Sequence, residues 1–473
     1  MFFNSFAFLI FLPIVLLGHT LLRGTALRIW LLVMSYVFYG WGQPWWYLGL
    51  LCFSSVLDYW AAIRIDEAAT QTKRRAWLLA SLIGNLGVLA AFKYLPFILR
   101  SASRLLSFSH VSIDLPVADI PLPPGISFYT FQTLSYTIDV YRRQMKPARK
   151  FLDMALFVAF FPQLVAGPIE RASNVMHQLA EKQHRTREDL LQGITRILWG
   201  LTKKMVFADW LGLFVYPIFS FPEGSSGAEI WLATYAFAFQ IYLDFSAYSD
   251  IAIGVSRMMG VHLQENFRWP YLARNISEFW RRWHISFSTW LRDYLYIPLG
   301  GSRKGPGRTI FNVFIVMLLG GLWHGAASKF IAWGLWIGLG IAIFHIAERL
   351  GWAHKESKTY SWRDAVGIFI TFHWICVSWV FFRANSVLEA LVMLKRMCIP
   401  MDMAINTAPK EMTRTLVLLA ILVAVHVVRG LGLGLNWEKL RSTWAVGLVW
   451  GCLAVLILLL FAPGHAQFIY FQF

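Results

Sequence analysis

Two histidines lie in sequence surroundings that suit proton transfer. His324 falls inside an apolar stretch of membrane-spanning length, and His284 precedes it in 256–308, a polar segment that holds many of the chain's charges. An ionisable side chain at membrane depth is costly and therefore usually serves a function, and histidine has the unperturbed pKa closest to neutrality. The neighbouring Gly321 and Gly325 let another backbone or a thin substrate come close, because they carry no side chain. This pattern indicates general-base catalysis.

Both histidines also have structural interpretations that the residues alone leave open. His324 could hydrogen-bond between packed helices, and the spacing of Gly321 and Gly325 also fits close helix packing. His284 could bond to a neighbouring backbone group at the membrane interface. We expect a structural role for four further histidines in or beside apolar stretches, which are His19, His345, His373 and His426.

Motifs for other kinds of chemistry fail on inspection. The glycine-rich residues 300–305 are followed by Pro306, so they do not form a phosphate-binding loop of the G-x-x-x-x-G-K-[ST] type. The sequence has no H-E-x-x-H and no G-x-S-x-G. The cysteines are far apart and form no C-x-x-C, which favours free thiols over disulfides or metal ligands; they are Cys52, Cys376, Cys398 and Cys452.

The segment around His284 has the pattern of an amphipathic helix. Aromatic side chains recur at helical spacing on one face, and Arg281 and Arg282 lie on the other. Asn275 or Ser277 could cap this helix, and Asn275 has capping-box spacing to Glu278. We therefore predict an interfacial helix with His284 on the flank of its aromatic face, which consists of Phe279, Trp283, Phe287, Trp290 and Tyr294.

Two carboxylates, Asp244 and Asp250, lie in an otherwise apolar predicted helix. A buried carboxylate must pair with another group or face a cavity. We expect these two to pair with arginines of 256–308 rather than to act in catalysis.

The elements that position these residues are membrane helices. Of the 473 residues, 57% are hydrophobic and 15% are charged, whereas a soluble domain has about 25% charged residues. The mean hydropathy is +0.53, and long apolar runs recur throughout, which favours an all-α polytopic membrane protein over a β-barrel. The net charge of +17 comes from basic residues in short loops, where they set orientation, so we expect no nucleic-acid partner.

Apolar runs of spanning length predict about eleven or twelve crossings in one membrane domain over residues 1–473, with re-entrant or interfacial helices in addition. Basic residues in the first and third loops place those loops in the cytoplasm and the N-terminus in the periplasm. Residues 124–141 are too polar for a simple lipid-facing span, and a re-entrant segment near 162–168 would explain the basic stretch 171–187. The expected spans are 4–22, 28–47, 47–63, 76–95, 151–168, 190–217, 229–255, 309–326, 329–348, 365–383, 413–429 and 443–462.

Several strings resemble the membrane-bound O-acyltransferase family. The most specific are 266–286, which ends in Trp-His-Ile-Ser, and 322–325, which reads Leu-Trp-His-Gly. The similarity is greatest to the bacterial branch, which includes the membrane subunit for alginate O-acetylation, its peptidoglycan and cellulose counterparts, and the teichoic-acid D-alanine transfer protein. Other matching strings are 125–132, 161–169, 244–250 and 468–473.

The resemblance implies a ring of helices around a central tunnel, with His324 catalytic and His284 assisting it, by orienting the donor or stabilising an oxyanion. It implies an acyl thioester donor, such as acetyl-CoA, used as a substrate and not as a tightly bound cofactor. We expect Arg281 and Arg282 to bind anionic parts of this donor, and the matched motifs place Trp323, Asn266 and Asp244 with the substrates.

In this bacterial branch the acyl group crosses the inner membrane to an external acceptor, often a periplasmic esterase-like partner that completes transfer to a polysaccharide. We therefore expect a multi-pass inner-membrane protein that meets a thioester donor, a periplasmic partner protein, a polysaccharide acceptor and membrane lipid. Alginate, cellulose and peptidoglycan stay open as acceptors. The alternatives are D-alanyl transfer, acylation of lipid or protein, and a non-enzymatic polysaccharide export subunit, although the absence of an internal repeat disfavours a transporter.

Overall fold

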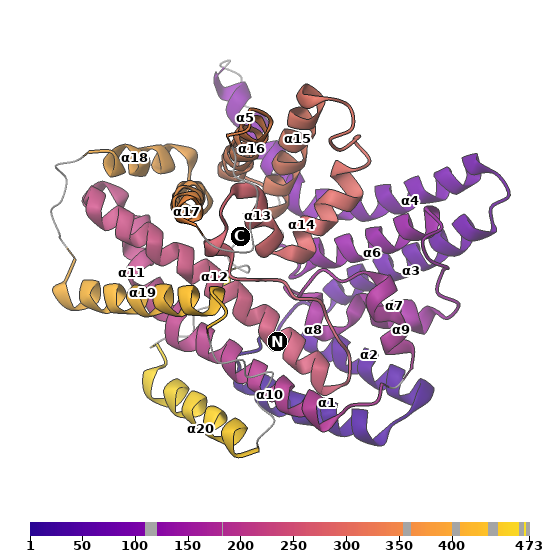
Figure 1. The fold of residues 1–473 in the computed structure, drawn as a ribbon. Helices are drawn as coiled ribbons and strands as arrows, with labels where there is room; N and C mark the ends of the chain where they lie inside the picture. Colours follow the sequence, from indigo (N-terminus) through magenta and orange to yellow (C-terminus); the bar gives the residue numbers. More distant parts are fainter. Residues whose placement is uncertain are drawn as a thin grey trace. The chain divides into compact units, whose positions relative to one another are not determined.

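The chain is mostly helical in the part that the computed structural model describes (Figure 1). This part is residues 1–108, 121–181, 183–352, 361–399, 407–433, 443–462 and 468–469. Six helical stretches in this part are long and apolar enough to cross a membrane. They are α3 (Trp46–Glu67), the continuous stretch Gln71–Ser103, α15 (Pro306–His324), α16 (Ser328–Arg349), α17 (Trp362–Arg383) and α19 (Pro409–Gly430). This confirms the all-α polytopic membrane protein predicted from the sequence.

Each of these stretches coincides with a predicted span, and three more predicted spans are shorter apolar helices. Those three are α1 (Phe6–Leu21), α2 (Gly24–Gly40) and α20 (Thr443–Leu460). The predicted span 229–255 lies within α12 (Gly227–Met258), a helix of 32 residues whose side chains are mostly buried in protein. The predicted span 190–217 is also helical, but a π-helical segment interrupts it.

The predicted span 151–168 is wrong as a single helix. It divides into α7 (Phe151–Ala159) and the short α8 (Phe161–Leu164), because Phe160 leaves the helical conformation and Pro162 begins a new turn. The chain then runs irregularly to Arg171, and almost all of its side chains there are buried by protein. A covered break of this kind is what a re-entrant segment requires, and the side of the membrane on which 171–187 lies stays a prediction.

The helices gather into two compact units, and the single membrane domain expected over 1–473 stays a prediction. The first unit is Met1–Ile197 with Tyr248–Gln264, and the second is Leu198–Ala247 with Glu265–Phe473. Besides α1–α3, α7 and α8, the first contains α4 (Gln71–Leu89), η1 (Ala90–Tyr94), α5 (Leu95–Phe108), α6 (Ile126–Tyr141), α9 (Ala172–Ala180) and most of α10 (Arg187–Thr202). Besides α15–α17, α19, α20 and most of α12, the second contains η2 (Lys203–Ala208), α11 (Asp209–Ser220), η3 (Pro222–Gly224), η4 (Pro270–Leu272), α13 (Ile276–Arg282), α14 (Ile285–Leu291), η5 (Arg292–Tyr296) and α18 (Val387–Met397).

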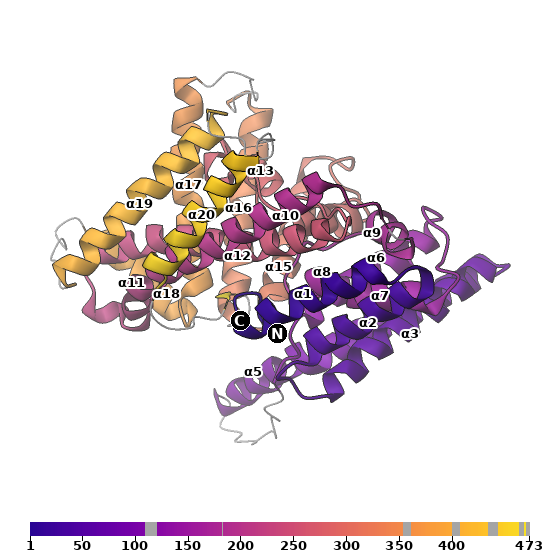
Figure 2. The same ribbon diagram turned by 90° about the horizontal axis from the view of Figure 1, so that it is seen from below.

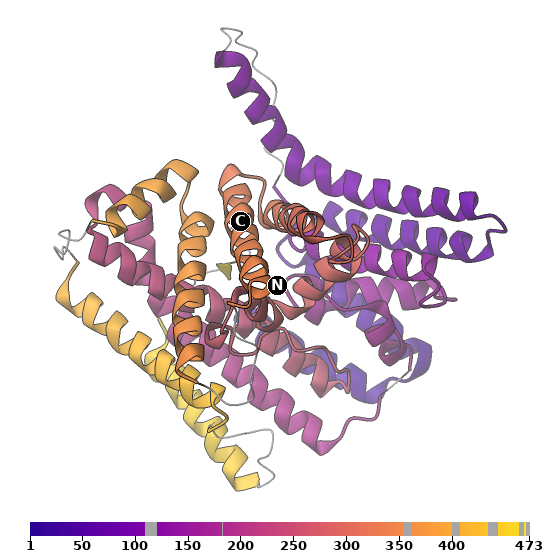
Figure 3. The ribbon, with the colours of Figure 1, turned by 45° about the horizontal axis from the view of Figure 1, so that its top comes forward.

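In the first unit, α3, α4 and α6 lie side by side (Figures 1 and 3). The sequence predicted that 124–141 would not face lipid, and α6 is indeed buried along nearly its whole length, as a regular helix. Asp58 of α3 accepts hydrogen bonds from Ser81 and Asn85 of α4, which satisfies this carboxyl group inside the bundle. Buried polar groups therefore hold α3 and α4 together.

Glycine allows close helix contact at two further places. In the first unit, α10 and α12 lie side by side (Figure 2), and a Cβ on Gly254 would stand 2.7 Å from the carbonyl oxygen of Gly193. In the second unit, α15 and α16 form a hairpin in which Gly321 lies against the backbone of Phe330. The expectation that another backbone approaches the glycines beside His324 is thus confirmed for Gly321.

Candidate active site

The segment that carries His284 is not the single interfacial helix that the sequence predicted. It consists of α13, α14 and the π-helical η5, and the first break falls at His284, whose φ of 42° and ψ of 55° are left-handed. Such a conformation ends a right-handed helix and costs energy in a non-glycine residue, and it is often found at functional sites.

The aromatic face of this segment points into protein, not toward a membrane interface. All five of its rings are buried, and Phe279 and Trp283 belong to the hydrophobic core of the second unit; the five are Phe279, Trp283, Phe287, Trp290 and Tyr294. The predicted cap is confirmed, because Asn275 accepts a hydrogen bond from the backbone N–H of Glu278 at 2.8 Å. The Glu278 side chain bonds to the N–H of Arg274 instead of closing a capping box.

A short extended stretch positions the His284 ring. The backbone N–H of Ile285 donates to the carbonyl oxygen of Asn266 at 2.9 Å, and that of Arg268 donates to Arg282 at 2.8 Å. These bonds place Asn266 beside His284. The Asn266 side-chain oxygen then lies 3.2 Å from His284 Nδ1, and it accepts hydrogen bonds from the N–H and the hydroxyl of Ser286 at 3.2 and 2.9 Å.

His324 is the last residue of α15, and aromatic rings surround it. The ring centroids of Trp333, Phe382 and Phe287 lie 5.0, 5.3 and 5.6 Å from that of His324. His324 is 9% exposed and therefore nearly enclosed. The carboxyl end of a helix dipole favours positive charge, so this position supports the imidazolium that forms when His324 accepts a proton.

The structure brings His284 and His324 together in the second unit. Phe287 stacks on Trp323 at 4.4 Å, and His284 lies 5.0 Å from Phe287 and 6.0 Å from Trp323. Burial lowers the pKa of His284 well below its ordinary value, and the positive charge of His324 lowers it further. His284 is therefore neutral at physiological pH. Of the residues expected at the site, His324, His284, Trp323 and Asn266 form one buried cluster.

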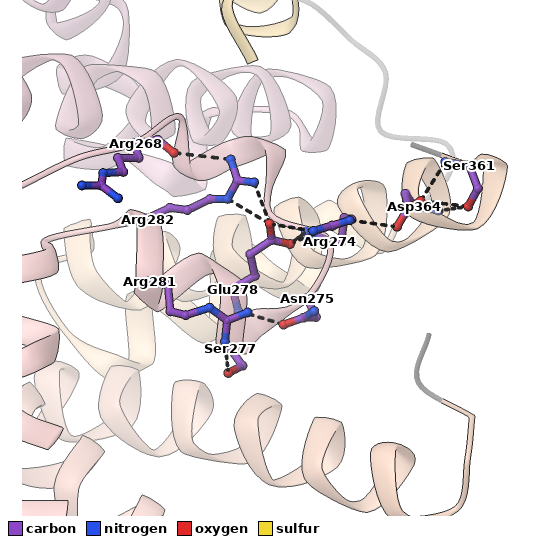
Figure 4. Close-up of polar contacts among 9 residues, drawn as sticks. All are labelled: Arg268, Arg274, Asn275, Ser277, Glu278, Arg281, Arg282, Ser361 and Asp364. Atoms are coloured by element: carbon purple, nitrogen blue, oxygen red, sulfur yellow. Dashed lines mark hydrogen bonds and ion pairs between the residues drawn. The ribbon is translucent and has the colours of Figure 1, made fainter. Parts of the chain in front are cut away.

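The two arginines expected to bind the donor differ in their surroundings (Figure 4). Arg282 is tied to Glu278 by hydrogen bonds of 2.6 and 3.0 Å, so much of its charge is already balanced. Arg281 is exposed and contacts the hydroxyl of Ser277 at 3.1 Å. Arg281 is thus the better placed of the two to meet an anion from solution.

Glu278 is the centre of a buried ion-pair network. It accepts from Arg274 at 3.1 Å as well as from Arg282, and Arg274 reaches Asp364 at the start of α17 at 3.7 Å (Figure 4). Burial alone would raise the pKa of Glu278, but the hydrogen bonds from the two arginines outweigh it and hold the pKa below its ordinary value. This network fixes α13 to α17 and thereby the start of the segment that carries His284.

Asp244 and Asp250 do have ion-pair partners, but the expectation that these would be arginines of 256–308 is wrong. Asp244 pairs with Lys204 of η2 at 2.6 Å and accepts from the backbone N–H of Ile469 at 2.7 Å. Asp250 pairs with Arg196 of α10 at 2.9 Å. Sequence spacing could not identify these partners, because Lys204 and Arg196 are far from the two carboxylates along the chain and meet them only when the helices pack. Binding of substrate by Asp244 stays a prediction.

Several residues of this cluster had no place in the sequence-based site. Ser286 is two positions after His284 and ends the matching string 266–286, but no role was expected for it. Phe245 contacts His284 at 4.7 Å from α12, while Trp333 and Phe382 contact His324 from α16 and α17. Packing of distant helices brings these rings together. Phe245 lies in the matching string 244–250, whereas no local sequence signal marks Trp333 or Phe382. The arrangement places two histidines close together among buried aromatic side chains, and His324 is the one positioned to accept a proton.

Comparison with known proteins places this chain in a family. The family model for membrane-bound O-acyltransferases matches residues 75–382. The probable alginate O-acetylase AlgI of Pseudomonas putida is 37% identical over 99% of each chain. The peptidoglycan O-acetyltransferase of Helicobacter pylori is 36% identical over 82% of this chain and 77% of its own length. The teichoic acid D-alanyltransferase of Bacillus subtilis is 28% identical over 55% of this chain and 68% of its own length. This chain belongs to the membrane-bound O-acyltransferase family and is an acyltransferase.

Proposed function

We propose that this protein transfers an acetyl group from a cytoplasmic acyl thioester, such as acetyl-CoA, across the membrane to an external hydroxyl acceptor. The final product is an O-acetylated envelope or extracellular polysaccharide, and alginate is the acceptor most strongly favoured. The observation that carries the proposal is the gathering of His284 and His324 in one buried aromatic cluster of an acyltransferase.

The relatives favour acetyl over other acyl groups. The proteins named for alginate and peptidoglycan O-acetylation are 37% and 36% identical and match most of this chain. The D-alanyltransferase match is weaker and covers 55% of it. D-alanyl transfer, acylation of lipid or protein, and a non-enzymatic export role are the competing proposals.

In the proposed reaction, His324 is the general base. It takes the proton of the acceptor hydroxyl while the hydroxyl oxygen bonds to the thioester carbonyl carbon. The carbon–sulfur bond then breaks, and the proton passes from His324 to the thiolate that leaves. A positioned base contributes about 10²- to 10⁴-fold in rate, and the end of α15 stabilises the transient imidazolium.

The donor would approach from the cytoplasm, where Arg281 supplies positive charge for its anionic groups. Arg282 contributes less, because Glu278 shares its guanidinium. On the external side, a periplasmic esterase-like partner would receive the acetyl group and pass it to the polysaccharide. A cytoplasmic donor and a periplasmic partner would place the protein in the inner membrane. The basic residues of the first and third loops favour a periplasmic N-terminus.

A variant of His324 tests the proposal directly. We expect His324→Ala to insert normally and to lower transfer of labelled acetyl from acetyl-CoA, in membrane vesicles that contain the partner and polysaccharide, by about 10²- to 10⁴-fold. His345→Ala is the matched control, because His345 contacts Glu348 on the side of α16 and should leave transfer unchanged.

Two outcomes would redirect the assignment. Full O-acetylation by an inserted His324→Ala protein would refute catalysis at His324 and favour the export role. Transfer of labelled D-alanine, with no transfer of acetyl, would replace the proposed donor and leave the base in place.

A further inference from the structure

The Asn266 side chain has only one orientation that its neighbours permit. The backbone N–H of Ser286 can only donate, and it points at the Asn266 Oδ1 position from 3.2 Å. An amide nitrogen in that position would set donor against donor. The hydroxyl of Ser286 donates to the same atom at 2.9 Å. The atom beside His284 is therefore the amide oxygen.

This orientation decides which nitrogen of His284 carries the proton. Nδ1 of His284 lies 3.2 Å from the Asn266 oxygen, and an amide oxygen only accepts hydrogen bonds. The Ser286 hydroxyl oxygen also lies 3.5 Å from Nδ1, but its proton is donated to Asn266, so it too can only accept from Nδ1. Nδ1 must therefore be the N–H nitrogen. A neutral imidazole has one such proton, so Nε2 holds a lone pair and is the basic atom of the ring.

We propose that Asn266 and Ser286 are positioning residues that fix His284 as the Nδ1–H tautomer, so that Nε2 accepts a hydrogen bond from a neutral O–H, S–H or N–H group of the substrates. The proposal rests on the proposed acyl transfer for the identity of those substrates. It changes the role expected for His284, because a ring with a lone pair at Nε2 cannot donate from that atom to an oxyanion.

The surroundings of His284 keep it neutral. His324 is a titratable group that acts on it, and a positive charge on His324 opposes a second one on His284. The rings closest to His284 are uncharged and lie 4.7 Å away at Phe245 and 5.0 Å away at Phe287. The backbone N–H of Ile285 donates to the backbone carbonyl oxygen of Asn266, which holds the Asn266 backbone beside His284.

The tautomer can be measured on the resting protein. Protonated and unprotonated imidazole nitrogens have well-separated ¹⁵N chemical shifts. Solid-state NMR of the full chain in lipid, with labelled histidine, would record all 12 histidines, and subtraction of the His284→Asn spectrum would isolate His284. We expect a protonated Nδ1 and an unprotonated Nε2 at pH 7.

Two substitutions of Asn266 separate positioning from packing. Asn266→Leu removes the acceptor and should release the Nε2–H tautomer and lower acetyl transfer by at least about tenfold. Asn266→Asp keeps an acceptor-only oxygen and should restore the Nδ1–H tautomer. Its negative charge favours the imidazolium, so the acid limb of the pH–rate profile should move to higher pH. Ser288→Ala is the matched control, because the Ser288 hydroxyl bonds to the carbonyl oxygen of Trp283.

A resting His284 protonated at Nε2 would overturn the proposal, as would an Asn266→Leu protein that keeps the Nδ1–H tautomer. If Asn266→Leu proves too unstable to insert, the wild-type spectrum and the Asn266→Asp variant still show which nitrogen of His284 carries the proton. The spectrum requires no turnover, so this inference can fail while His324→Ala still abolishes acetyl transfer, and it can stand if the acyl group is not acetyl.

Discussion

The spacing of α15 and α16 should control activity, although neither contact surface takes part in the chemistry. A Cβ added to Gly334 of α16 would lie 3.1 Å from the carbonyl carbon of Met317 and closer still to its oxygen. Both obstacles are backbone atoms, so no side chain can rotate out of the way. The hairpin that carries His324 must therefore open if Gly334→Ala is to fold.

The required movement sets the size of the effect. Non-bonded carbon atoms prefer separations of 3.5–4.0 Å, so relief of this clash needs a shift of about 1 Å. Overpacking of this kind costs about 1–3 kcal/mol of stability, and misplacing a catalytic group by about 1 Å can lower the rate by about 10²-fold. We expect Gly334→Ala to remain folded and to lose about that factor in acetyl transfer.

Gly307→Ala is the matched control, because Gly307 lies in α15 and nothing stands within 4 Å of a Cβ added there. Acetyl transfer per folded protein is the assay, with the folded amount taken from size-exclusion chromatography of the solubilised chain. Wild-type transfer by a folded Gly334→Ala protein would refute the idea that this glycine contact positions His324. A loss equal to that of Gly307→Ala would refute it as well.

Two further predictions concern stability. Burial raises the pKa of Glu170 from 4.5 to about 7, so the folded state keeps a proton that the unfolded chain loses between these values. The free energy of unfolding should therefore fall by up to about 3 kcal/mol as the pH rises from 4.5 through 7. Thermal unfolding between pH 5 and 8 should show this slope in the wild type but not in Glu170→Gln. Equal slopes in the two proteins would contradict the role of Glu170. Glu278→Ala should lower the free energy of unfolding by about 3 kcal/mol, because it leaves Arg274 and Arg282 without their shared carboxylate. The exposed Glu348→Ala should change it by less than about 0.5 kcal/mol, and equal losses in the two variants would contradict the role of the network.

The sequence was sufficient to predict features that depend on local composition. The apolar run around His324 and the polar character of 124–141 are properties of consecutive residues, and the structure confirms a helix at the first and burial away from lipid at the second. The cap at Asn275 is local too, since it needs only a side chain and an N–H three residues later. Hydropathy failed at 151–168, because a buried irregular segment is as apolar as a membrane helix.

The break at His284 could not be predicted in the same way. Neither glycine nor proline marks it, and the aromatic residues continue at helical spacing on both sides. The left-handed conformation depends on hydrogen bonds from this segment to Asn266 and Arg268, which are contacts between distant residues. The partner of Asp244 was missed for the same reason, because Lys204 reaches it only once η2 packs against α12.

The two histidines are built for different protonation states, and this difference bears on the mechanism. His324 stands at the negative end of a helix dipole, which stabilises it as a cation. His284 is buried, and the Asn266 oxygen that faces its Nδ1 also accepts from two donors of Ser286, so that oxygen has less capacity to stabilise a positive charge on the ring. Burial lowers the pKa of His284, and charge on either ring opposes charge on the other, so a proton taken up by the cluster is favoured on His324. Because His324 can accept a proton and the neighbouring His284 resists one, the proton of the acceptor hydroxyl should pass to His324.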